Sequence, residues 1–184
     1  MAMWNSWRGC KKCSDGCLYC YIHKGDAKRI DRFMKCIPDD WGEGYENVVV
    51  CCTVENQKNA DFRLEIFKKL PIKHKCITAQ PLIEAINIEQ YLDGIELVVV
   101  GGESDKYARP LIYDWVLDIR EQCIRKNVAF EFRQCGTHFI KDGREYILQT
   151  KDLCAQARKA DIDFKPKELE NEQRGKRIHR KISK

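Results

Sequence analysis

Four cysteines stand close together near the start of the chain, in the stretch "GCKKCSDGCLYCY" at residues 9–21. They are Cys10, Cys13, Cys17 and Cys20. Thiols this close together serve three kinds of site in proteins: a disulfide framework, a zinc site or an iron–sulfur site. Which of the three applies decides what chemistry the chain can perform.

The composition argues against disulfides. Of the 184 residues, 43% are hydrophobic and 33% are charged, as in ordinary globular domains. The opening stretch "MAMWNSWRGC" lacks the basic and then apolar order of a secretory signal, and no run approaches the roughly 20 apolar residues of a membrane span. We therefore expect a cytoplasmic protein without membrane contact, in which the eleven cysteines stay reduced and the clustered ones bind metal or react.

The spacing favours iron and sulfur over zinc. Paired C-x-x-C knuckles that bind zinc usually stand a dozen or more residues apart, whereas the two pairs here are separated by only three residues. The C-x2-C-x2-C-x3-C run of bacterial ferredoxins is also absent. The pattern that the sequence does contain is Cys13-x3-Cys17-x2-Cys20, with Tyr19 before the last cysteine.

This pattern resembles the signature of radical S-adenosylmethionine enzymes. The resemblance implies that three thiolates hold a 4Fe-4S cluster and leave one iron open to S-adenosylmethionine. An electron from the cluster, supplied by a reductant such as a flavodoxin or ferredoxin, then cleaves the cofactor to a 5′-deoxyadenosyl radical, which the protein positions.

Four blocks give a more specific resemblance: "WNSWRGC…SDGCLYCY", "CTVENQKNADFRL", "VVVGGESDKYARPL" and "REQCIRKNVAFEFRQCG", which lie within about residues 4–26 and 47–136. They resemble a phage- and prophage-borne family of unknown function that has an N-terminal three-cysteine motif and is regarded as radical S-adenosylmethionine-like. Its first cysteine corresponds to Cys10, so Cys10 and Cys13 compete for the third ligand position. Relatives carry several dozen more residues before the segment "KRIDRF", so the resemblance implies a shortened member that lacks one or two βα units.

The elements that must position the cysteine loop follow from the hydrophobic pattern. Apolar runs at 47–56, 73–81, 94–104 and 128–136 predict strands, and amphipathic segments at 59–70, 82–92 and 113–127 predict helices. Such alternation predicts an α/β fold with a parallel sheet covered on both faces, built from repeated βα units as a partial TIM-like barrel, after an N-terminal cysteine loop at 1–26. We expect one α/β domain over residues 1–164, with the βα repeats at 47–136.

Ligands of such folds bind at the carboxyl ends of the strands. The predicted strands end on polar residues or glycines, and five of these are candidate cofactor-binding residues: Thr53, Glu55, Gly101, Gly102 and Glu103. The resemblance further suggests that the "GGE" segment at 101–103 meets the methionyl amine of S-adenosylmethionine, or that Glu103 orients substrate together with Arg109. Cys51, Cys52, Cys76 and Cys123 lie on apolar positions and are expected to be buried.

The net charge of +5 resides entirely in the tail at residues 165–184, which holds eight basic and three acidic side chains. Such a tail is either a solvated terminus or an arm that contacts the phosphates of a nucleic acid. The sequence thus leaves three functions open: a radical S-adenosylmethionine-type protein acting on an unknown substrate, with a nucleic acid or nucleotide among the candidates; a zinc- or cluster-binding module without catalysis; or a shortened remnant without activity.

Overall fold

The computed structural model describes residues 30–166 of the chain. The cysteines of the N-terminal loop and residues 167–184 of the basic tail lie outside the described residues.

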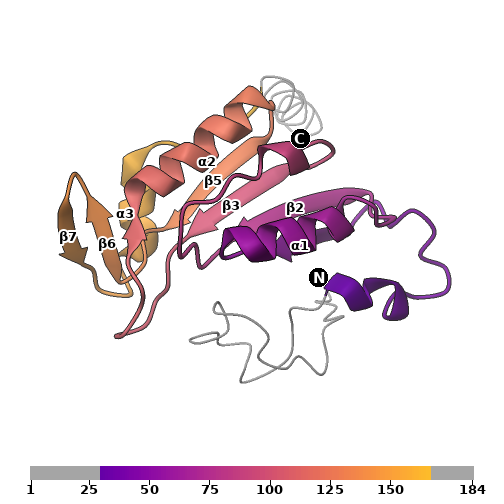
Figure 1. Cartoon of the computed structure of the whole chain (residues 1–184), viewed down its shortest axis with the longest axis horizontal. Helices are drawn as coiled ribbons and strands as arrows, with labels where there is room; N and C mark the ends of the chain where they lie inside the picture. Colours follow the sequence, from indigo (N-terminus) through magenta and orange to yellow (C-terminus); the bar gives the residue numbers. More distant parts are fainter. Residues whose placement is uncertain (1–29, 167–184) are drawn as a thin grey trace, which may run out of the picture.

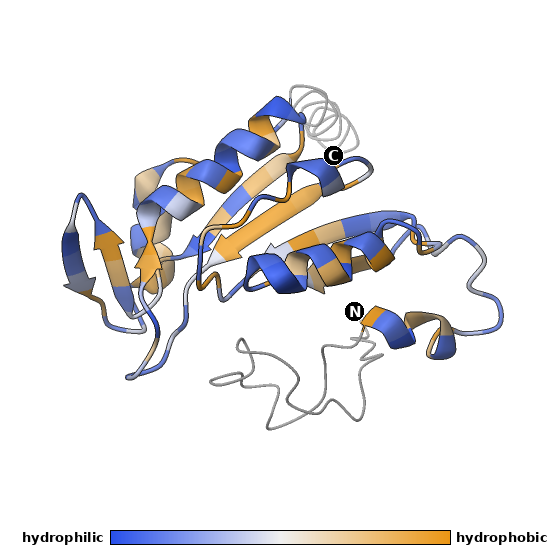
Figure 2. Cartoon of the chain, in the orientation of Figure 1, coloured by the Kyte–Doolittle hydropathy of each residue, from blue (hydrophilic) through white to orange (hydrophobic). Residues whose placement is uncertain are grey.

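The centre of the fold is a parallel sheet of four strands (Figure 1). The strands pair in the order in which they occur along the chain, and they are β1 (Val49–Thr53), β2 (His74–Ala79), β3 (Leu97–Gly101) and β5 (Ala129–Gln134). All four lie inside the predicted strand ranges, which confirms the expected parallel α/β architecture. Figure 2 shows β3 almost wholly in the hydrophobic colour, as suits a central strand.

Two helices lie across one face of this sheet: α1 (Gln57–Phe67) and α2 (Tyr113–Arg125) (Figure 1). The side chain of Asn56 caps α1 by accepting a hydrogen bond from the Asn59 N–H at 2.9 Å. The helices bury Leu64 and Phe67 from α1, and Ile119 from α2, against the strands. The predictions of helices at 59–70 and 113–127 are therefore confirmed within a few residues.

Among residues 30–166, α1 and α2 cover one face of the sheet, and the expectation of a sheet covered on both faces stays a prediction. One face supplies the hydrophobic core, through Val50, Cys52, Ile77, Ala79, Val98, Val100, Phe130 and Phe132. The other face, which we call the open face, carries the partly accessible Cys51, Thr53, Thr78, Glu131 and Arg133 and the buried Cys76 and Val99. The two helices share one face because right-handed crossovers between strands in sequential order place successive connections on the same side.

The segment 82–92 is not the helix that its spacing predicts. It forms an extended crossover with one short 3-10 turn, η4 (Glu89–Tyr91). Backbone N–H groups inside it are taken by tertiary partners: Asn87 donates to the Gln57 side chain at 2.6 Å, and Ile88 donates to the Gln122 side chain at 2.7 Å. Because these donors bond outside the segment, they cannot form a helical ladder, and the apolar side chains are buried without one.

A second, smaller sheet follows the main one and was not foreseen. It has the order β4-β6-β7 and consists of β4 (Leu111–Ile112), β6 (His138–Lys141) and β7 (Arg144–Ile147). The β6–β7 hairpin turns at Asp142 and Gly143, both of which have positive φ angles, and Asp-Gly is a favoured pair for such a turn. The helix α3 (Leu153–Ala160) then packs on β5.

Both ends of the described region are tied to the core. At the start, the 3-10 helix η3 (Ile30–Lys35) packs against α1, and Phe33 meets the Trp41 ring edge-on at a centroid distance of 5.5 Å. At the end, Phe164 exchanges two backbone hydrogen bonds with Phe130 and so covers part of the outer edge of β5.

Residues 30–166 contain no closed barrel, since the main sheet ends at β1 on one side. The partial TIM-like barrel therefore stays a prediction. Among the helices of this region, none combines the length and the apolar character needed to cross a bilayer.

We expect Leu64→Ala to lower the free energy of unfolding by about 2–5 kcal/mol, because the side chain is 1% exposed and its loss leaves a cavity under α1. Phe62→Ala is the matched control on the same helix: Phe62 is 60% exposed, so its truncation should change stability by less than about 0.5 kcal/mol. Urea denaturation followed by circular dichroism measures both. Equal losses in the two variants would contradict the assigned helix face.

Candidate functional site at the carboxyl edge of the sheet

The carboxyl ends of the four parallel strands meet along one edge, and the backbone holds them together there. Ile83 N donates to Glu55 O at 3.0 Å, which ties the crossover after β2 to the end of β1. On the other side, Gly102 N donates to Gln134 O at 3.1 Å, and the Gln134 side chain donates back to Gly102 O at 2.6 Å. The strand-end residues singled out in the sequence are thus brought to one edge.

Glu55 is completely buried and forms an ion pair with Arg63 of α1. Arg63 Nη1 donates to Glu55 Oε2 at 2.6 Å and to the Thr53 carbonyl at 2.8 Å. Asn59 Nδ2 donates to Glu55 Oε1 at 3.1 Å. The carboxylate is therefore satisfied on both oxygens by α1, and its first role is to hold the helix against the end of β1.

The partner Arg63 was not identified from the sequence, although a signal was present. Arg63 lies at the spacing of the buried residues Ala60, Leu64 and Phe67, and a charged residue on the apolar stripe of a helix indicates a buried partner. Cys52 lies near the pair on the core face, where burial raises the pKa of its thiol to about 12 and keeps it protonated.

The two glycines after β3 are explained by close packing between backbones. A Cβ atom on Gly102 would lie 2.7 Å from Cys135 O and 2.8 Å from Gly136 Cα. A Cβ atom on Gly101 would meet the side chains of Gln80 and Gln134 at 3.0 and 3.1 Å. Gly102 in particular must lack a side chain, because its neighbours are main-chain atoms that cannot move aside.

Glu103 is buried and engaged by Arg109 from the loop that follows it. The Arg109 backbone N–H and Nε donate to Glu103 Oε2 at 2.8 and 3.2 Å, and Arg109 Nη2 contacts Oε1. The Arg109 side chain is 28% exposed. The structure thus pairs Glu103 with Arg109, and the role that the sequence suggested for the two residues, orienting a substrate, stays a prediction.

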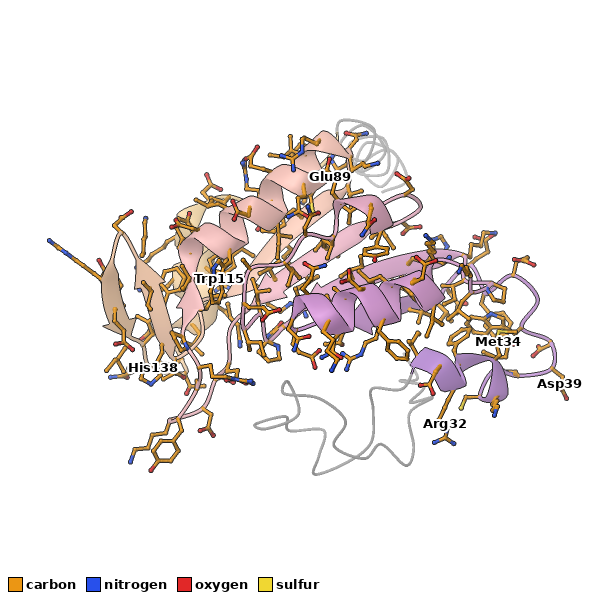
Figure 3. The ribbon with its side chains drawn as sticks, viewed as in Figure 1. Arg32, Met34, Asp39, Glu89, Trp115 and His138 are labelled. Carbon is orange, nitrogen blue, oxygen red and sulfur yellow. The ribbon has the colours of Figure 1, made fainter. Side chains whose placement is uncertain are left out.

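The loop between Glu103 and Arg109 is also fastened to the second sheet. Thr137 N donates to Glu103 O at 2.7 Å. His138, labelled in Figure 3, lies with Nε2 3.3 Å from Lys106 O and Nδ1 2.7 Å from Glu145 Oε1. The hydrogen bond to Glu145 raises the pKa of His138, so protonation strengthens this attachment.

A thiol pair on the open face is a feature that the sequence reasoning missed. Cys51 of β1 and Cys76 of β2 are paired in register, so their side chains leave the sheet on the same face. Cys51 is exposed, which corrects the expectation that it is buried, whereas Cys76 is buried as expected. The alternation of exposed and buried residues along β1 follows from its one-sided burial, and the continuous apolar run at 47–56 concealed it.

The surroundings of Cys51 favour its thiolate. A hydrogen bond from Cys76, together with one from Thr78 and the positive charge of Arg133, lowers the pKa of Cys51 to about 7 despite partial desolvation. The same interaction raises the pKa of Cys76, which stays protonated and acts as the donor. Cys51 is thus expected to ionise at lower pH than an ordinary cysteine.

The described residues contain no group of three or more side chains of the metal-binding types placed to hold an ion. Cys10, Cys13, Cys17 and Cys20 lie outside the described residues, so their role as metal ligands stays a prediction. The same holds for the cofactor-binding roles of Thr53, Glu55 and the segment 101–103: the structure gives their positions and their partners within the chain.

Replacing Arg63 should strongly lower the stability of the fold. We expect Arg63→Met to lower the free energy of unfolding by about 3–5 kcal/mol, because it leaves the Glu55 carboxylate buried without a counter-charge. The double variant Glu55→Gln with Arg63→Met should lose less, since no charge remains. Lys69→Met, which breaks the exposed pair with Glu65, is the control and should cost about 0–1 kcal/mol. A double variant as unstable as Arg63→Met would contradict this account.

Alkylation by iodoacetamide tests the Cys51 thiolate. The rate at Cys51 should rise with pH to a plateau, with its midpoint near pH 7, because the thiolate forms as pH rises through the lowered pKa of about 7. Peptide mass spectrometry resolves this site from the other cysteines. In Cys76→Ala the midpoint should move up towards the ordinary thiol value of about 8.5. A midpoint at that ordinary value in the unaltered chain would show that the pair does not exist in solution.

Comparison with known proteins adds a family but no activity. No curated protein and no solved structure matches the chain. Residues 26–181 match the family described as "Protein of unknown function (DUF5131)", and this match begins after the last of the four clustered cysteines. Since the matched residues make up most of the chain, the protein belongs to the DUF5131 family.

Proposed function

We propose that this protein is an iron–sulfur protein of the radical S-adenosylmethionine type. The observation that carries the proposal is the spacing Cys13-x3-Cys17-x2-Cys20, with Cys10 as the alternative third ligand, ahead of a parallel α/β sheet. Thiolates are the donors that iron–sulfur clusters use, and three of them leave one iron open. When bound, the cluster and S-adenosylmethionine supply a 5′-deoxyadenosyl radical.

The carboxyl edge of the sheet supports this proposal through what it offers a ligand. Ligands of parallel α/β folds bind beyond the carboxyl ends of the strands, and this edge presents Thr53, Gln80 and Gln134 as partly accessible polar groups. Because Arg109 already pairs with the Glu103 carboxylate, we assign the contacts with the cofactor to the partly accessible side chains of Thr53, Gln80 and Gln134. Their hydroxyl and amide groups can hydrogen-bond to the methionyl amine and carboxylate of the cofactor.

The proposal also names a class of substrate. A nucleic acid or nucleotide is favoured by the basic tail, whose eight Lys and Arg side chains would neutralise phosphates. Most of this tail lies outside the described residues.

A cluster- or zinc-binding module without catalysis is the second candidate, and one observation favours it. Both carboxylates at the edge, Glu55 and Glu103, already have arginine partners from the chain, and the packing explains Gly102 without a ligand. The described edge is therefore complete as a structural unit. A remnant that has lost activity fits the same observation.

Reconstitution without oxygen tests the cluster. Supplied with iron and sulfide, the full chain should become brown and bind iron and sulfide in equal amounts. Cys17→Ala and Cys20→Ala should each abolish iron binding, because neither residue has a neighbour that can substitute for it. Cys10→Ala and Cys13→Ala should each be milder, since one can replace the other as the third ligand, and Cys154→Ala is the control. Binding of one zinc and no iron under these conditions would overturn the iron–sulfur proposal.

Cofactor cleavage then separates the enzyme from the module. The reduced, reconstituted protein should convert S-adenosylmethionine to 5′-deoxyadenosine and methionine, measured by liquid chromatography. Thr53→Val should weaken cofactor binding by about 1.5–3 kcal/mol, the usual range for a hydrogen bond to a charged group. A rate equal to that of the Cys17→Ala variant, with the cluster present in the unaltered chain, would favour the module without catalysis.

A further inference from the structure

A pocket lies on the side of β5 that faces the helices, away from the open face. It has a volume of about 250 Å³ and is enclosed by the start of α2, by β5, by the second sheet and by α3. The residues that line it are Tyr113, Phe132, Cys135, Phe139, Lys141, Tyr146, Leu148, Gln156, Lys159 and Ala160.

Three aromatic rings form one wall of the pocket. The ring centroid of Tyr113 lies 6.3 Å from that of Phe132 and 5.7 Å from that of Phe139, and Phe132 and Phe139 are 6.3 Å apart. Phe132 and Phe139 are buried, whereas Tyr113 is only partly buried. At the rim, Tyr146 remains 44% exposed. The wall thus offers aromatic surface to a flat ring.

The charges around the pocket have one sign. Two lysines line it, and the lining contains no Asp or Glu. Lys141 Nζ lies 4.9 Å from the centre of the Tyr113 ring, and Lys159 projects from the last turn of α3. Within residues 30–166, neither ammonium has a carboxylate at ion-pair distance, whereas six other lysines and arginines on exposed surfaces of this region do. The pocket therefore combines an aromatic wall with two unneutralised cations.

We propose that this pocket binds a small aromatic acid. The flat ring would pack against the mutually tilted rings of Tyr113, Phe132 and Phe139, and the anionic group would lie between the ammonium groups of Lys141 and Lys159. The volume sets the size, because pockets for drug-sized ligands hold roughly 300–1,000 Å³, so one ring or two fused rings fill the space here. Gln156 adds an amide at the rim that can bond to a heteroatom of the ring.

This site is independent of the function proposed above. The residues that line the pocket include no member of the Glu55–Arg63 pair or of the Glu103–Arg109 pair.

A titration of the isotope-labelled full chain, followed by NMR, tests the proposal with three probes of nearly equal shape: naphthoate, naphthyl phosphate and the neutral naphthylmethanol. Both anions should bind saturably and shift the signals of the second sheet and α3, and the neutral alcohol should bind at least about threefold more weakly because it gains no charged contact. The tighter of the two anions identifies the acid as a carboxylate or a phosphate.

Variants then locate the site. Lys141→Met and Lys159→Met keep most of the packing and should each weaken anion binding by roughly three- to tenfold. Lys151→Met is the control, because Lys151 is exposed near the start of α3 but does not line the pocket, and it should bind as the unaltered chain does. Three results would each overturn the proposal: no saturable binding of either anion, equal affinity for the neutral alcohol, or unchanged affinity in both pocket variants.

Discussion

A carboxylate that is removed from water must find a positive partner, and at the end of β1 the carboxylate of Glu55 finds one in Arg63. The pair is buried, and Arg63 also takes up the Thr53 carbonyl, so one side chain joins the end of the first strand to the second turn of α1. The angle at which α1 leaves the sheet depends on this contact, and the backbone bond from Ile83 to Glu55 extends it to the next crossover. Buried charge pairs of this kind specify an arrangement more than they stabilise it.

The side of the sheet on which the long helices lie follows from the handedness of the crossovers between the strands. With strands in sequential order and right-handed crossovers, α1 and α2 must lie on the same side, and they leave a second face that has no helix of its own among the described residues (Figure 1). The core face takes the largest hydrophobic side chains, whereas the open face keeps Cys51, Thr78 and Arg133. The exposure and lowered pKa of Cys51 therefore follow from topology, because Cys51 and the buried Cys52 occupy opposite faces of the same strand.

The two candidate sites differ in whether their charged groups have partners within the described region. The carboxyl edge holds carboxylates that arginines already neutralise, and its partly accessible polar side chains are those of Thr53, Gln80 and Gln134. The pocket beside β5 holds cations that no carboxylate neutralises within the described region. A ligand adds most to binding energy where the protein has left a charge unpaired, since elsewhere it must first displace an internal partner.

The sequence by itself determined the parallel α/β architecture, the four strands of the main sheet and both long helices, because burial on a sheet or along a helix stripe imposes a period that can be read locally. It also predicted that the strand ends lie along one edge, because the carboxyl ends of parallel strands lie on the same side of a sheet. Only the tertiary structure decided the remainder. The segment 82–92 is not helical because the side chains of Gln57 and Gln122 take N–H groups from its interior, and these partners lie far away in the sequence. The partners of Glu55 and the two faces of β1 likewise depend on where α1 crosses the sheet, which is a property of the packed chain and not of any local pattern.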